Sequence, residues 1–322
     1  MSFKNKIVMV TGGAGFIGSH ICDKALEEGA EKVICADNFI ANTEKNIQHL
    51  KNNERFEFEF GDVADSDFIT PLVKKSDVIF HEAASKFITC LKTPRVDLNT
   101  NIVGTFNILE AAKDTGTRIV YASTGSVFGS AESPKHSMKE DYIKNPTSMY
   151  GISKLTGEHY VLYYAKEFGI KATSLRYFHV YGPRQDFTGE AGVVSIFLSK
   201  VLSGKEPIIY GTGEQIRCFT YIQDDIDANL LLYKNNKTIG KAYNVASTNR
   251  ITINQLAELI VKKYGENLKP IFGPARKGEN MWPIPDTSKI EKLGFKAKVS
   301  FEEGLHLTKK WVEGELKRIK GQ

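Results

Sequence analysis

The segment Ile7-Val-Met-Val-Thr-Gly-Gly-Ala-Gly-Phe-Ile-Gly18 joins a short apolar run to a glycine-rich turn, and a helical pattern follows it. Gly12, Gly15 and Gly18 allow a tight turn, a close approach of the backbone and packing of a helix against a strand. The free amides at the start of that helix would face an anion such as a pyrophosphate. A plain strand-to-helix turn would have a similar sequence, so the interpretation depends on the segments that follow.

Apolar runs of strand length alternate with longer helical patterns through the first half of the chain. The expected strands cover residues 7–11, 32–36, 56–60, 78–81, 118–123 and 171–176. The expected helices cover residues 16–28, 99–115 and 148–168. This alternation predicts βαβ units and an α/β fold with a doubly wound parallel sheet of the Rossmann type. Ligands would then bind at the carboxyl ends of the strands.

The chain changes character after residue 176, where loops, glycine, proline and aromatic residues become more frequent. Tyr181-Gly-Pro-Arg-Gln185 and Tyr210-Gly-Thr-Gly213 are typical of turns. We therefore expect a dinucleotide-binding Rossmann domain over residues 1–176 and a smaller substrate domain over residues 177–322. Residues 242–246 would return to the sheet.

The composition is that of an ordinary globular protein, with 41% hydrophobic and 25% charged residues in a chain of 322. Lys and Arg are scattered among Asp and Glu, and the net charge of +5 disfavours a nucleic-acid-binding stripe while suiting a phosphorylated substrate. No stretch approaches the ~18 apolar residues of a membrane span, and the start of the chain lacks a signal-peptide pattern. We expect a cytoplasmic protein without a membrane partner.

The cysteines and histidines show no metal-ligand spacing. Cys22, Cys35, Cys90 and Cys218 are far apart and include no C-x-x-C pair. The seven histidines include no H-x-x-x-H pair. We therefore expect reduced thiols and no bound metal.

Two acidic residues follow the second and third expected strands. Asp37 stands about 20 residues beyond the glycine-rich turn, where a carboxylate accepts hydrogen bonds from an adenosine ribose and repels a 2′-phosphate. This favours NAD over NADP, whereas a simple loop-capping role would leave the cofactor open. Asp62, in Gly61-Asp-Val63, would similarly lie near the adenine amino group, although Gly-Asp is also a common turn.

Tyr150-Gly-Ile-Ser-Lys154 places a phenol and an ammonium four residues apart, so both lie on one face of the expected helix. A tyrosine with a pKa near ~10 is a poor base, but a nearby lysine cation and a positive nicotinamide ring would favour its phenolate. Thr124 follows a strand end, where its hydroxyl would hydrogen-bond the reacting oxygen. Taken alone, Tyr150 and Lys154 could be an ordinary surface pair on an amphipathic helix. Their combination with Thr124 and the glycine-rich turn indicates catalysis.

With these motifs the chain resembles the extended branch of the short-chain dehydrogenase/reductase superfamily, from Ile7 to about Trp311. That branch includes nucleotide-sugar epimerases, dehydratases and decarboxylases. His81-Glu-Ala-Ala84 and Arg176-Tyr-Phe178 are similar to further segments of the family. The resemblance implies that the catalytic residues are Thr124, Tyr150 and Lys154. It implies that NAD is held by Gly12, Gly15, Phe16, Ile17, Gly18, Asp37, Asn38, Asp62, Val63, Ala83, Lys86, Asn101, Ser123, Tyr150, Lys154 and Tyr177.

The resemblance also implies a nucleotide-sugar substrate, a UDP-sugar above all. Its expected contacts are Lys86, Thr124, Ser126, Tyr150, His179, Arg217, Arg276 and Pro283. Arg217 and Arg276 would hold the diphosphate, because a guanidinium donates paired hydrogen bonds to phosphate oxygens; each would otherwise be a solvated surface arginine. The chain departs from the 4-epimerases at three positions. It has His179 where they usually have Asn, Cys218 where they usually have Asp, and Glu279 where they usually have Asp.

The residues after Thr124 separate the reactions of this branch. In the similar 4,6-dehydratases an Asp-Glu pair follows this threonine, and in UDP-glucuronate decarboxylases a glutamate follows nearby. This chain has Gly125 and Ser126 instead. Neither is a strong acid or base, so a 4-keto intermediate would take its hydride back on the other face. The expected activity is C4 epimerisation of UDP-glucose and UDP-galactose. A compact Pro283, at the family's gate for the 2-N-acetyl group, would also admit UDP-N-acetylglucosamine and UDP-N-acetylgalactosamine.

Two alternative functions stay open. One is another nucleotide-sugar enzyme of this branch, a dehydratase, decarboxylase or reductase. The other is a non-catalytic dinucleotide-binding sensor, although a pure binder has no need of Thr124, Tyr150 and Lys154. The resemblance implies a homodimer through helices that contain residues 101–112 and 148–164, whose apolar faces would equally suit packing within one chain.

Overall fold

The parallel sheet begins with the strand that precedes the glycine-rich turn. A computed structural model of the chain describes residues 2–41, 43–85, 87–188, 192–275 and 280–321, with the side chains of 87–89 also left out. The backbone contacts divide the chain into two units. Unit 1 comprises Met1–Val127, Ser148–Arg176 and Ile226–Tyr243, and unit 2 comprises Phe128–Thr147, Tyr177–Asp225 and Asn244–Gln322.

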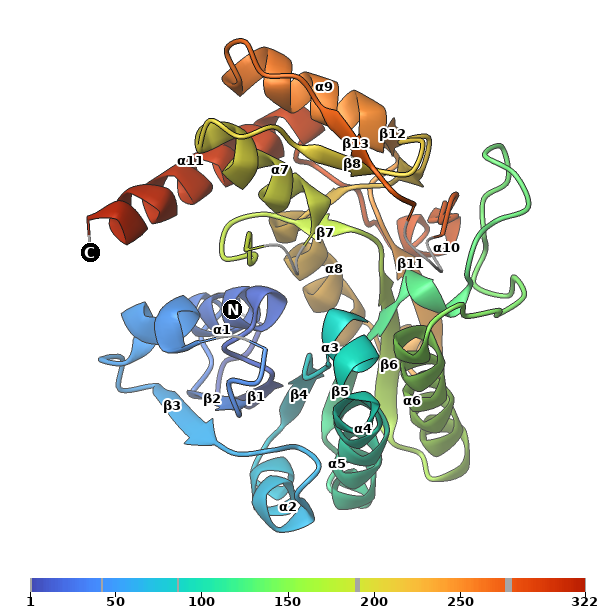
Figure 1. Cartoon of the computed structure of the whole chain (residues 1–322). Coiled ribbons are helices and arrows are strands. Elements are labelled where there is room, and N and C mark those ends of the chain that lie inside the picture. Colours follow the sequence, from blue (N-terminus) through green and yellow to red (C-terminus); the bar gives the residue numbers. More distant parts are fainter. Residues whose placement is uncertain (1, 42, 86, 189–191, 276–279, 322) are drawn as a thin grey trace. The chain divides into compact units, whose positions relative to one another are not determined.

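A seven-stranded sheet forms the centre of unit 1, in the order β11-β6-β5-β4-β1-β2-β3 (Figure 1). Its strands are β1 (Ile7–Thr11), β2 (Lys32–Asp37), β3 (Phe56–Phe60), β4 (Val78–His81), β5 (Arg118–Thr124), β6 (Lys171–Tyr177) and β11 (Ala242–Val245). β1 pairs in parallel with both β2 and β4, so the strand order reverses at this point. The expected Rossmann-type fold is confirmed, and open α/β sheets generally bind their ligands at such a reversal, beyond the carboxyl ends of the strands.

The strand sequences explain their places in the sheet. β1, β2, β4 and β5 are buried along nearly their whole length, as continuous apolar runs require in a sheet covered on both faces. β3 instead alternates Phe and Glu and lies at the edge, where its side chains are partly exposed. All six expected strands of the first half are present, each within one residue of its expected end.

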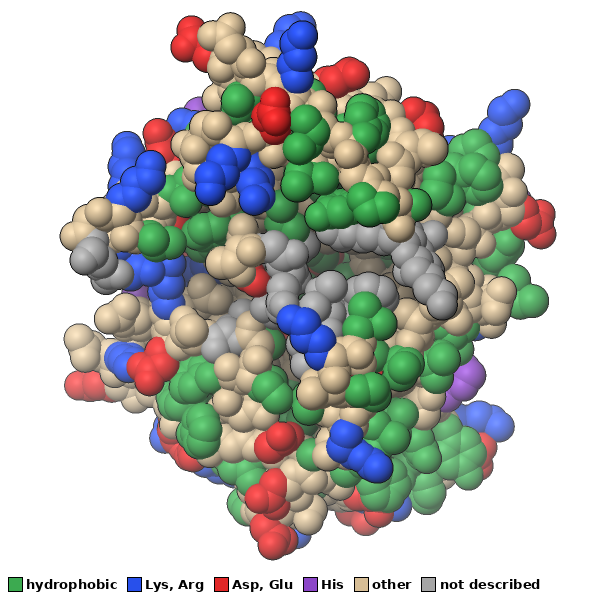
Figure 2. Space-filling model, in the orientation of Figure 1, with side chains coloured by type: hydrophobic (Ala, Val, Ile, Leu, Met, Phe, Trp, Pro, Cys, Tyr) green, Lys and Arg blue, Asp and Glu red, His purple; other side chains and the backbone are tan. Residues whose placement is uncertain are grey.

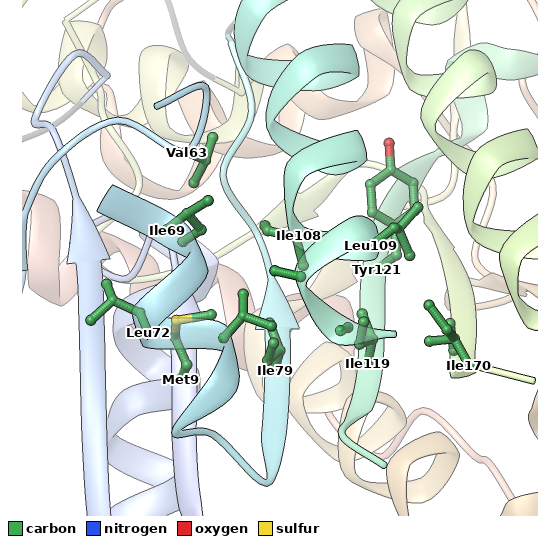
Figure 3. Close-up of a cluster of buried hydrophobic side chains, with 14 of the residues drawn as sticks. Met9, Val63, Ile69, Leu72, Ile79, Ile108, Leu109, Ile119, Tyr121 and Ile170 are labelled. Atoms are coloured by element: carbon green, nitrogen blue, oxygen red, sulfur yellow. The ribbon is translucent and has the colours of Figure 1, made fainter. Parts of the chain in front are cut away.

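Helices cover both faces of this sheet. They are α1 (Phe16–Glu27), α2 (Ser66–Lys74), α3 (Phe87–Lys92), α4 (Pro94–Leu98), α5 (Thr105–Ala112), α6 (Met149–Glu167) and α8 (Ile222–Lys234), with the shorter turns η1 (Glu44–Leu50), η2 (Asn99–Gly104), η3 (Gly125–Val127) and η4 (Asn236–Thr238). α2, α5 and α6 pack on one face, where the core cluster includes Met9, Val63, Ile69, Leu72, Ile79, Ile108, Leu109, Ile119, Tyr121 and Ile170 (Figure 3). On the other face Phe80 contacts Tyr233 of α8.

The helix expected over residues 99–115 is divided in the structure. Its first part, η2, is a π-helix, and α5 continues from Thr105. Two features accompany the wider turn: Gly104 approaches Val63 so closely that a Cβ would lie 2.4 Å from its Cγ2, and Asn101 is completely buried. Helical periodicity does not reveal such a turn, because the apolar spacing continues through it.

Unit 2 is built from short strand pairs and helices. Its strands are β7 (Val180–Tyr181), β8 (Ile208–Tyr210), β9 (Ile216–Arg217), β10 (Thr220–Tyr221), β12 (Ile251–Thr252) and β13 (Ile271–Gly273), which form the pairs β10-β7, β12-β9 and β13-β8. Its helices are α7 (Val193–Leu202), α9 (Ile253–Tyr264), α10 (Ser288–Glu291) and α11 (Phe301–Lys320). The turns expected at residues 181–185 and 210–213 are present, but the part expected to be rich in loops also holds these helices.

The division into units differs from a single boundary after residue 176. Residues 128–147 belong to unit 2, because the backbone amides of Ala131 and Met138 bond the carbonyls of Trp282 and Ile284. Residues 226–243 belong to unit 1 and return to the sheet through β11, close to the return expected at residues 242–246. Hydrogen bonds between segments far apart in sequence decide both assignments, and composition does not show them.

Candidate active site

The glycine-rich turn connects β1 to α1. Gly12 has a φ of +65°, and a Cβ there would lie 2.7 Å from the backbone nitrogen of Ala83. A Cβ on Gly18 would lie 2.3 Å from the carbonyl oxygen of Gly12. Both positions therefore require glycine, since backbone atoms occupy the space of a side chain. Gly15 closes the turn by donating its N–H to the Gly12 carbonyl at 3.0 Å.

α1 begins without a side-chain cap. Its N-cap residue is Gly15, which has no side chain to accept a hydrogen bond from the first amides of the helix. By contrast, α2, α6, α9 and α11 are capped by Asp65, Ser148, Thr252 and Ser300. Uncapped amides at the positive end of a helix form an anion site. The turn therefore fits a pyrophosphate, next to the partly exposed Phe16 and Ile17.

Asp37 lies beside this turn at the end of β2. Its carboxylate accepts the N–H of Ala14 at 3.0 Å and that of Phe39 at 2.8 Å. Burial raises the pKa of Asp37, and the backbone hydrogen bonds oppose that rise. The side chain of Asn38 donates to the Asp62 carboxylate at 3.1 Å. The two expected acidic residues thus lie at the ends of neighbouring strands, β2 and β3.

Other expected cofactor residues of unit 1 lie near the same strand ends. Val63, Asn101 and Ser123 are buried. Ala83 follows β4, and its N–H donates to the Thr11 hydroxyl at 3.3 Å. Tyr177, the last residue of β6, belongs to unit 2.

β5 and α6 bring Thr124 and Tyr150 together. Thr124 is the last residue of β5, and its hydroxyl oxygen accepts the N–H of Ser126 at 3.2 Å. α6 begins just before Tyr150, because the Ser148 side chain caps the helix by accepting the N–H of Gly151 at 3.1 Å. The hydroxyls of Tyr150 and Thr124 share a hydrogen bond. The two oxygens expected to meet the reacting hydroxyl are therefore neighbours.

The acidity of Tyr150 differs from the sequence expectation. Burial raises the pKa of Tyr150 to about 12, the hydrogen bond with Thr124 lowers it, and the carboxylates of Asp97 and Glu82 raise it further. The net shift is upward although Lys154 lies on the same helix, since the cost of burying a phenolate is the largest contribution. The residues of the chain therefore leave Tyr150 as a phenol at neutral pH. The positive nicotinamide ring is the other cation on which the expectation rested.

Lys154 is a buried cation with an unused donor. The residue is 1% exposed, and its Nζ has no hydrogen-bond acceptor within the described part of the chain. The ammonium lies 4.3 Å from the ring centroid of Tyr121. Burial lowers the pKa of Lys154 to about 8, although the nearby carboxylates of Glu82, Asp97 and Glu158 raise it. Such an ammonium fits the hydroxyl groups of a bound ligand.

A buried ion pair fixes α6 to β6 one helical turn beyond Lys154. The Arg176 Nη2 donates to Glu158 Oε1 at 2.6 Å and its Nε donates to Oε2 at 3.0 Å. The hydroxyl of Ser174 donates to the same carboxylate at 3.0 Å. Burial raises the pKa of Glu158, but the Arg176 charge and hydrogen bonds lower it more, so the net direction is down. Glu158 follows Lys154 by four residues, as Lys154 follows Tyr150, so the sequence alone places all three on one face of the helix.

In unit 2, His179 and Arg217 come from neighbouring segments. His179 has a φ of 46°, a left-handed conformation that asparagine adopts more readily than histidine. Burial and the Arg217 charge hold the pKa of His179 well below its usual range, so the imidazole is neutral. Arg217 is 8% exposed and donates to the carbonyls of Ile216 and Asn280, both at 2.9 Å. Burial raises the pKa of Cys218 to about 11, which leaves a neutral thiol beside the arginine.

The other expected substrate residues have mixed outcomes. Ser126 lies in η3 within unit 1. Pro283 is buried in unit 2, between two residues whose carbonyls bond the segment 131–138. Lys86, Arg276 and Glu279 lie outside the described residues.

Comparison with known proteins identifies the family. The profile of the "NAD dependent epimerase/dehydratase family" matches residues 8–246. A putative UDP-glucose 4-epimerase of Methanocaldococcus jannaschii is 37% identical over 95% of this chain and 98% of the relative. The crystal structure of a UDP-glucose 4-epimerase from Thermotoga maritima, with UDP-glucose, has a TM-score of 0.89 at 36% identity and covers 96% of this chain and 99% of its own. The chain belongs to the NAD-dependent epimerase/dehydratase family.

Relatives in this family perform more than one reaction. A UDP-N-acetyl-alpha-D-glucosaminuronate decarboxylase of Bacillus cytotoxicus is 33% identical over 95% of this chain and 97% of the relative. The resemblance to the extended short-chain dehydrogenase/reductase branch is confirmed, and the chain is an enzyme whose relatives are UDP-sugar epimerases and decarboxylases. Its cofactor is NAD. Membership does not by itself choose between epimerisation and decarboxylation.

The residues present fit NAD. The uncapped start of α1 suits a pyrophosphate, the Asp37 carboxylate lies beside it, and the unused Lys154 ammonium suits a ribose hydroxyl. In the described part of the chain, no three or more His, Cys, Asp or Glu side chains are grouped as a metal site. Among the described helices, none has the length and apolar character needed to cross a membrane. Figure 2 shows positive and negative side chains interspersed over the visible face.

Several residues near Tyr150 and Lys154 could not be picked out from the sequence. Glu82 follows the strand β4, and its charge acts on both Tyr150 and Lys154. Asp97 and Cys90 come from two short helices without amphipathic patterns of useful length. Only the packing of α3, α4 and α6 brings these side chains together.

Proposed function

We propose that this enzyme interconverts the C4 epimers of a UDP-hexose, UDP-glucose and UDP-galactose first of all, through a 4-keto intermediate. The observation that carries the proposal is the site around Thr124, Tyr150 and Lys154, in which the positions after Thr124 hold only Gly125 and Ser126. Gly125 is buried and Ser126 bonds back to Thr124, so neither serves as the acid or base of an elimination. A keto-sugar without that apparatus is reduced again.

The residues of the chain supply the proton chemistry. Bound NAD would supply the acceptor and donor of the C4 hydride, and its positive ring would favour the Tyr150 phenolate. Tyr150 takes the proton of the C4 hydroxyl, and Thr124 orients that oxygen by a hydrogen bond. The Lys154 ammonium stabilises the phenolate by its charge. When the keto group is reduced on its opposite face, Tyr150 returns the proton to the new hydroxyl.

A panel of nucleotide sugars tests the proposed reaction. The purified protein is incubated with UDP-galactose without added NAD, and the products are identified by NMR. We expect UDP-glucose to appear, and the Tyr150→Phe variant to lose turnover by on the order of 10³-fold. Accumulation of a keto-sugar or release of carbon dioxide would instead assign a dehydratase or a decarboxylase. An absence of turnover with every sugar of the panel would favour the non-catalytic sensor.

We also propose that Pro283 leaves room for a 2-N-acetyl group, so that UDP-N-acetylglucosamine and UDP-N-acetylgalactosamine are substrates. The support is the small volume of proline at the position that gates this group in the related 4-epimerases. Pro283→Tyr should lower kcat/KM for the acetylated sugars relative to the plain ones. An unchanged ratio of the two kcat/KM values would reject this part of the proposal.

A cytoplasmic homodimer is the proposed form of the enzyme. In unit 1, α5 and α6 expose large apolar side chains at Phe106, Met149, Ile152, Tyr160 and Tyr163. Exposed apolar groups on adjacent helices suit burial against a second copy. Light scattering after size exclusion should give twice the chain mass, and Tyr163→Glu should shift it towards the mass of one chain.

A further inference from the structure

A buried polar cluster lies behind the first turn of α6. Asp97, on α4, is 4% exposed and accepts hydrogen bonds from the Asn101 side-chain amide at 2.8 Å and from the Ser85 hydroxyl. Asn101 is completely buried, and its amide also donates to the Ser153 hydroxyl at 2.9 Å, while its carbonyl oxygen accepts the N–H of Ser85 at 3.1 Å. One carboxylate thus connects α4, η2 and the loop after β4 to α6.

The cluster reaches the catalytic residues through two contacts. The hydroxyl of Ser153, which lies next to Lys154, donates to the carbonyl of Tyr150 at 3.0 Å. The N–H of Tyr150 donates to the sulfur of Cys90, and the thiol of Cys90 bonds the Asp97 carboxylate. This amide belongs to the first turn of α6, where backbone donors have no partner within the helix. Cys90 therefore caps the helix at the catalytic tyrosine itself.

We propose that Asp97, acting through Cys90 and Asn101, is a positioning residue that holds the first turn of α6 and so places Tyr150 and Lys154 for proton transfer. The turn of η2 supports this role, because the wider helix turn places the Asn101 amide between Asp97 and Ser153. The kinetic part of the inference rests on the proposed function, and the structural part does not.

Asp97 also acts on Lys154 by its charge. The ammonium has ionisable neighbours from β4 and the loop after it, from β5, and from α4 and α6: His81, Glu82, Tyr121, Asp97 and Glu158. The carboxylates among them favour the charged lysine, and burial opposes it. Removing the Asp97 charge should therefore lower the pKa of Lys154 from its value of about 8.

The kinetic test compares Asp97→Asn with Asp114→Asn in the NAD-loaded enzyme. Asp114 is exposed and has a φ of 62°, which asparagine adopts easily, so this control makes the same chemical change at an exposed position of unit 1. For the interconversion of UDP-glucose and UDP-galactose, Asp97→Asn should lower kcat by about tenfold to hundredfold with little change in KM. The alkaline limb of its pH profile should move down by about one pH unit. A pH profile that superimposes on that of Asp114→Asn would overturn the proposal.

A second pair of variants covers the case in which Asp97→Asn does not fold. Cys90→Ala removes the acceptor of the Tyr150 N–H, and we expect kcat to fall by about tenfold. Cys90→Ser restores an acceptor and should recover kcat to within about twofold of the parent enzyme. Equal kcat values for Cys90→Ala and Cys90→Ser would contradict the capping role.

An NMR titration separates this inference from the proposed function. The protein is labelled with 13C at the lysine ε-carbon, and Lys154→Met assigns the signal. We expect a midpoint near pH 8 in the parent enzyme and about one pH unit lower in Asp97→Asn, whatever sugar the enzyme uses. Equal midpoints would reject the electrostatic role of Asp97 even if the epimerase activity is confirmed.

Discussion

The two ends of strand β5 each hold a buried cation, and the two cations are held in opposite ways. Arg118 begins the strand and is 6% exposed. Its guanidinium donates to the carbonyls of Lys171 at 2.7 Å and Leu232 at 2.9 Å, and to the hydroxyls of Thr173 and Thr238 at 2.6 and 2.7 Å. Lys154, beside the other end, has the face of Tyr121 and no hydrogen-bond acceptor within the described chain.

The difference separates stability from function. Burial lowers the pKa of Arg118 only to about 10, and the guanidinium stays charged at all ordinary pH values. Four oxygens that accept from Nη1 and Nη2 replace most of the water that the charge has lost, while Nε has no acceptor within the described chain. The buried ammonium of Lys154 lacks such oxygens, and its charge costs free energy until a ligand meets it. Residues kept in an unfavourable state of this kind are typical of active sites.

The largest expected effect comes from Lys154→Met. Turnover should fall by on the order of 10³-fold, because the phenolate loses its supporting charge. The folded-state pKa of Lys154, about 8, lies below its ordinary value of 10.5. The charged lysine therefore destabilises the folded state by its full amount below pH 8, and this destabilisation disappears above pH 10.5. The free energy of unfolding at pH 7 should therefore rise by roughly 3 kcal/mol. Urea unfolding measures it, with the exposed Lys171→Met as control; a decrease would contradict the comparison.

Arg118→Met should have the reverse outcome. The carbonyls and hydroxyls that it leaves behind are buried, so we expect the free energy of unfolding to fall by about 3 kcal/mol. The kcat of the folded enzyme should stay within about twofold of the parent, since these contacts lie at the end of β5 away from Thr124. Arg95→Met, at an exposed position of α4, serves as the control in the same denaturation series. A selective loss of kcat would show that the two ends are not separate.

Glu158→Gln tests the ion pair between these extremes. The substitution leaves the Arg176 guanidinium buried without this carboxylate, and we expect the free energy of unfolding to fall by about 3 kcal/mol at pH 7. The folded-state pKa of Glu158 is lowered, so its contribution is present above the ordinary pKa of 4.5 and is lost as the pH falls through the lower folded value. Stability curves of the parent and Glu158→Gln should therefore converge in acid. Parallel curves down to pH 3 would contradict this account.

The smallest effect concerns His81, which bridges the hydroxyls of Thr11 at 2.7 Å and Thr105 at 3.0 Å. Burial and the Lys154 charge lower the pKa of His81 to about 3, below its ordinary 6.5. The stabilisation from the neutral ring is therefore present above pH 6.5 and is lost as the pH falls towards 3. Between pH 7 and pH 6 the free energy of unfolding of the parent should fall by about 0.7 kcal/mol more than that of His81→Gln. Equal losses in both proteins would show that folding does not lower the pKa of His81.

The sequence predicted unit 1 better than unit 2 for a physical reason. Strands buried on both faces need continuous apolar runs, and the glycines of the turn have no substitute, so both leave clear patterns. The strands of unit 2 are two or three residues long, which is too short for any periodicity. Residues 128–147 join unit 2 through backbone hydrogen bonds with residues 282–284, and no local pattern records such a partnership.

The proposed catalytic residues and the polar groups around them divide in the same way. Thr124, Tyr150 and Lys154 could be found because a strand end and a helix repeat fix their spacing. Asp97, Cys90 and Ser85 could not, since they come from three short segments whose polar side chains resemble those of any surface loop. The acidity of Tyr150 was also hidden, because burial raises its pKa to about 12 and burial is a property of the packed site.

The order of the amino acids by itself determined the parallel sheet, the glycine-rich turn and the helix that carries a tyrosine and a lysine on one face. These features follow from interactions between residues near each other in the chain, or from the single requirement that apolar runs be buried. The tertiary structure decided the charges: which carboxylates surround Lys154, which oxygens receive Arg118, and which groups lose water. Electrostatic energies depend on distance and burial, and distant segments set both when they pack.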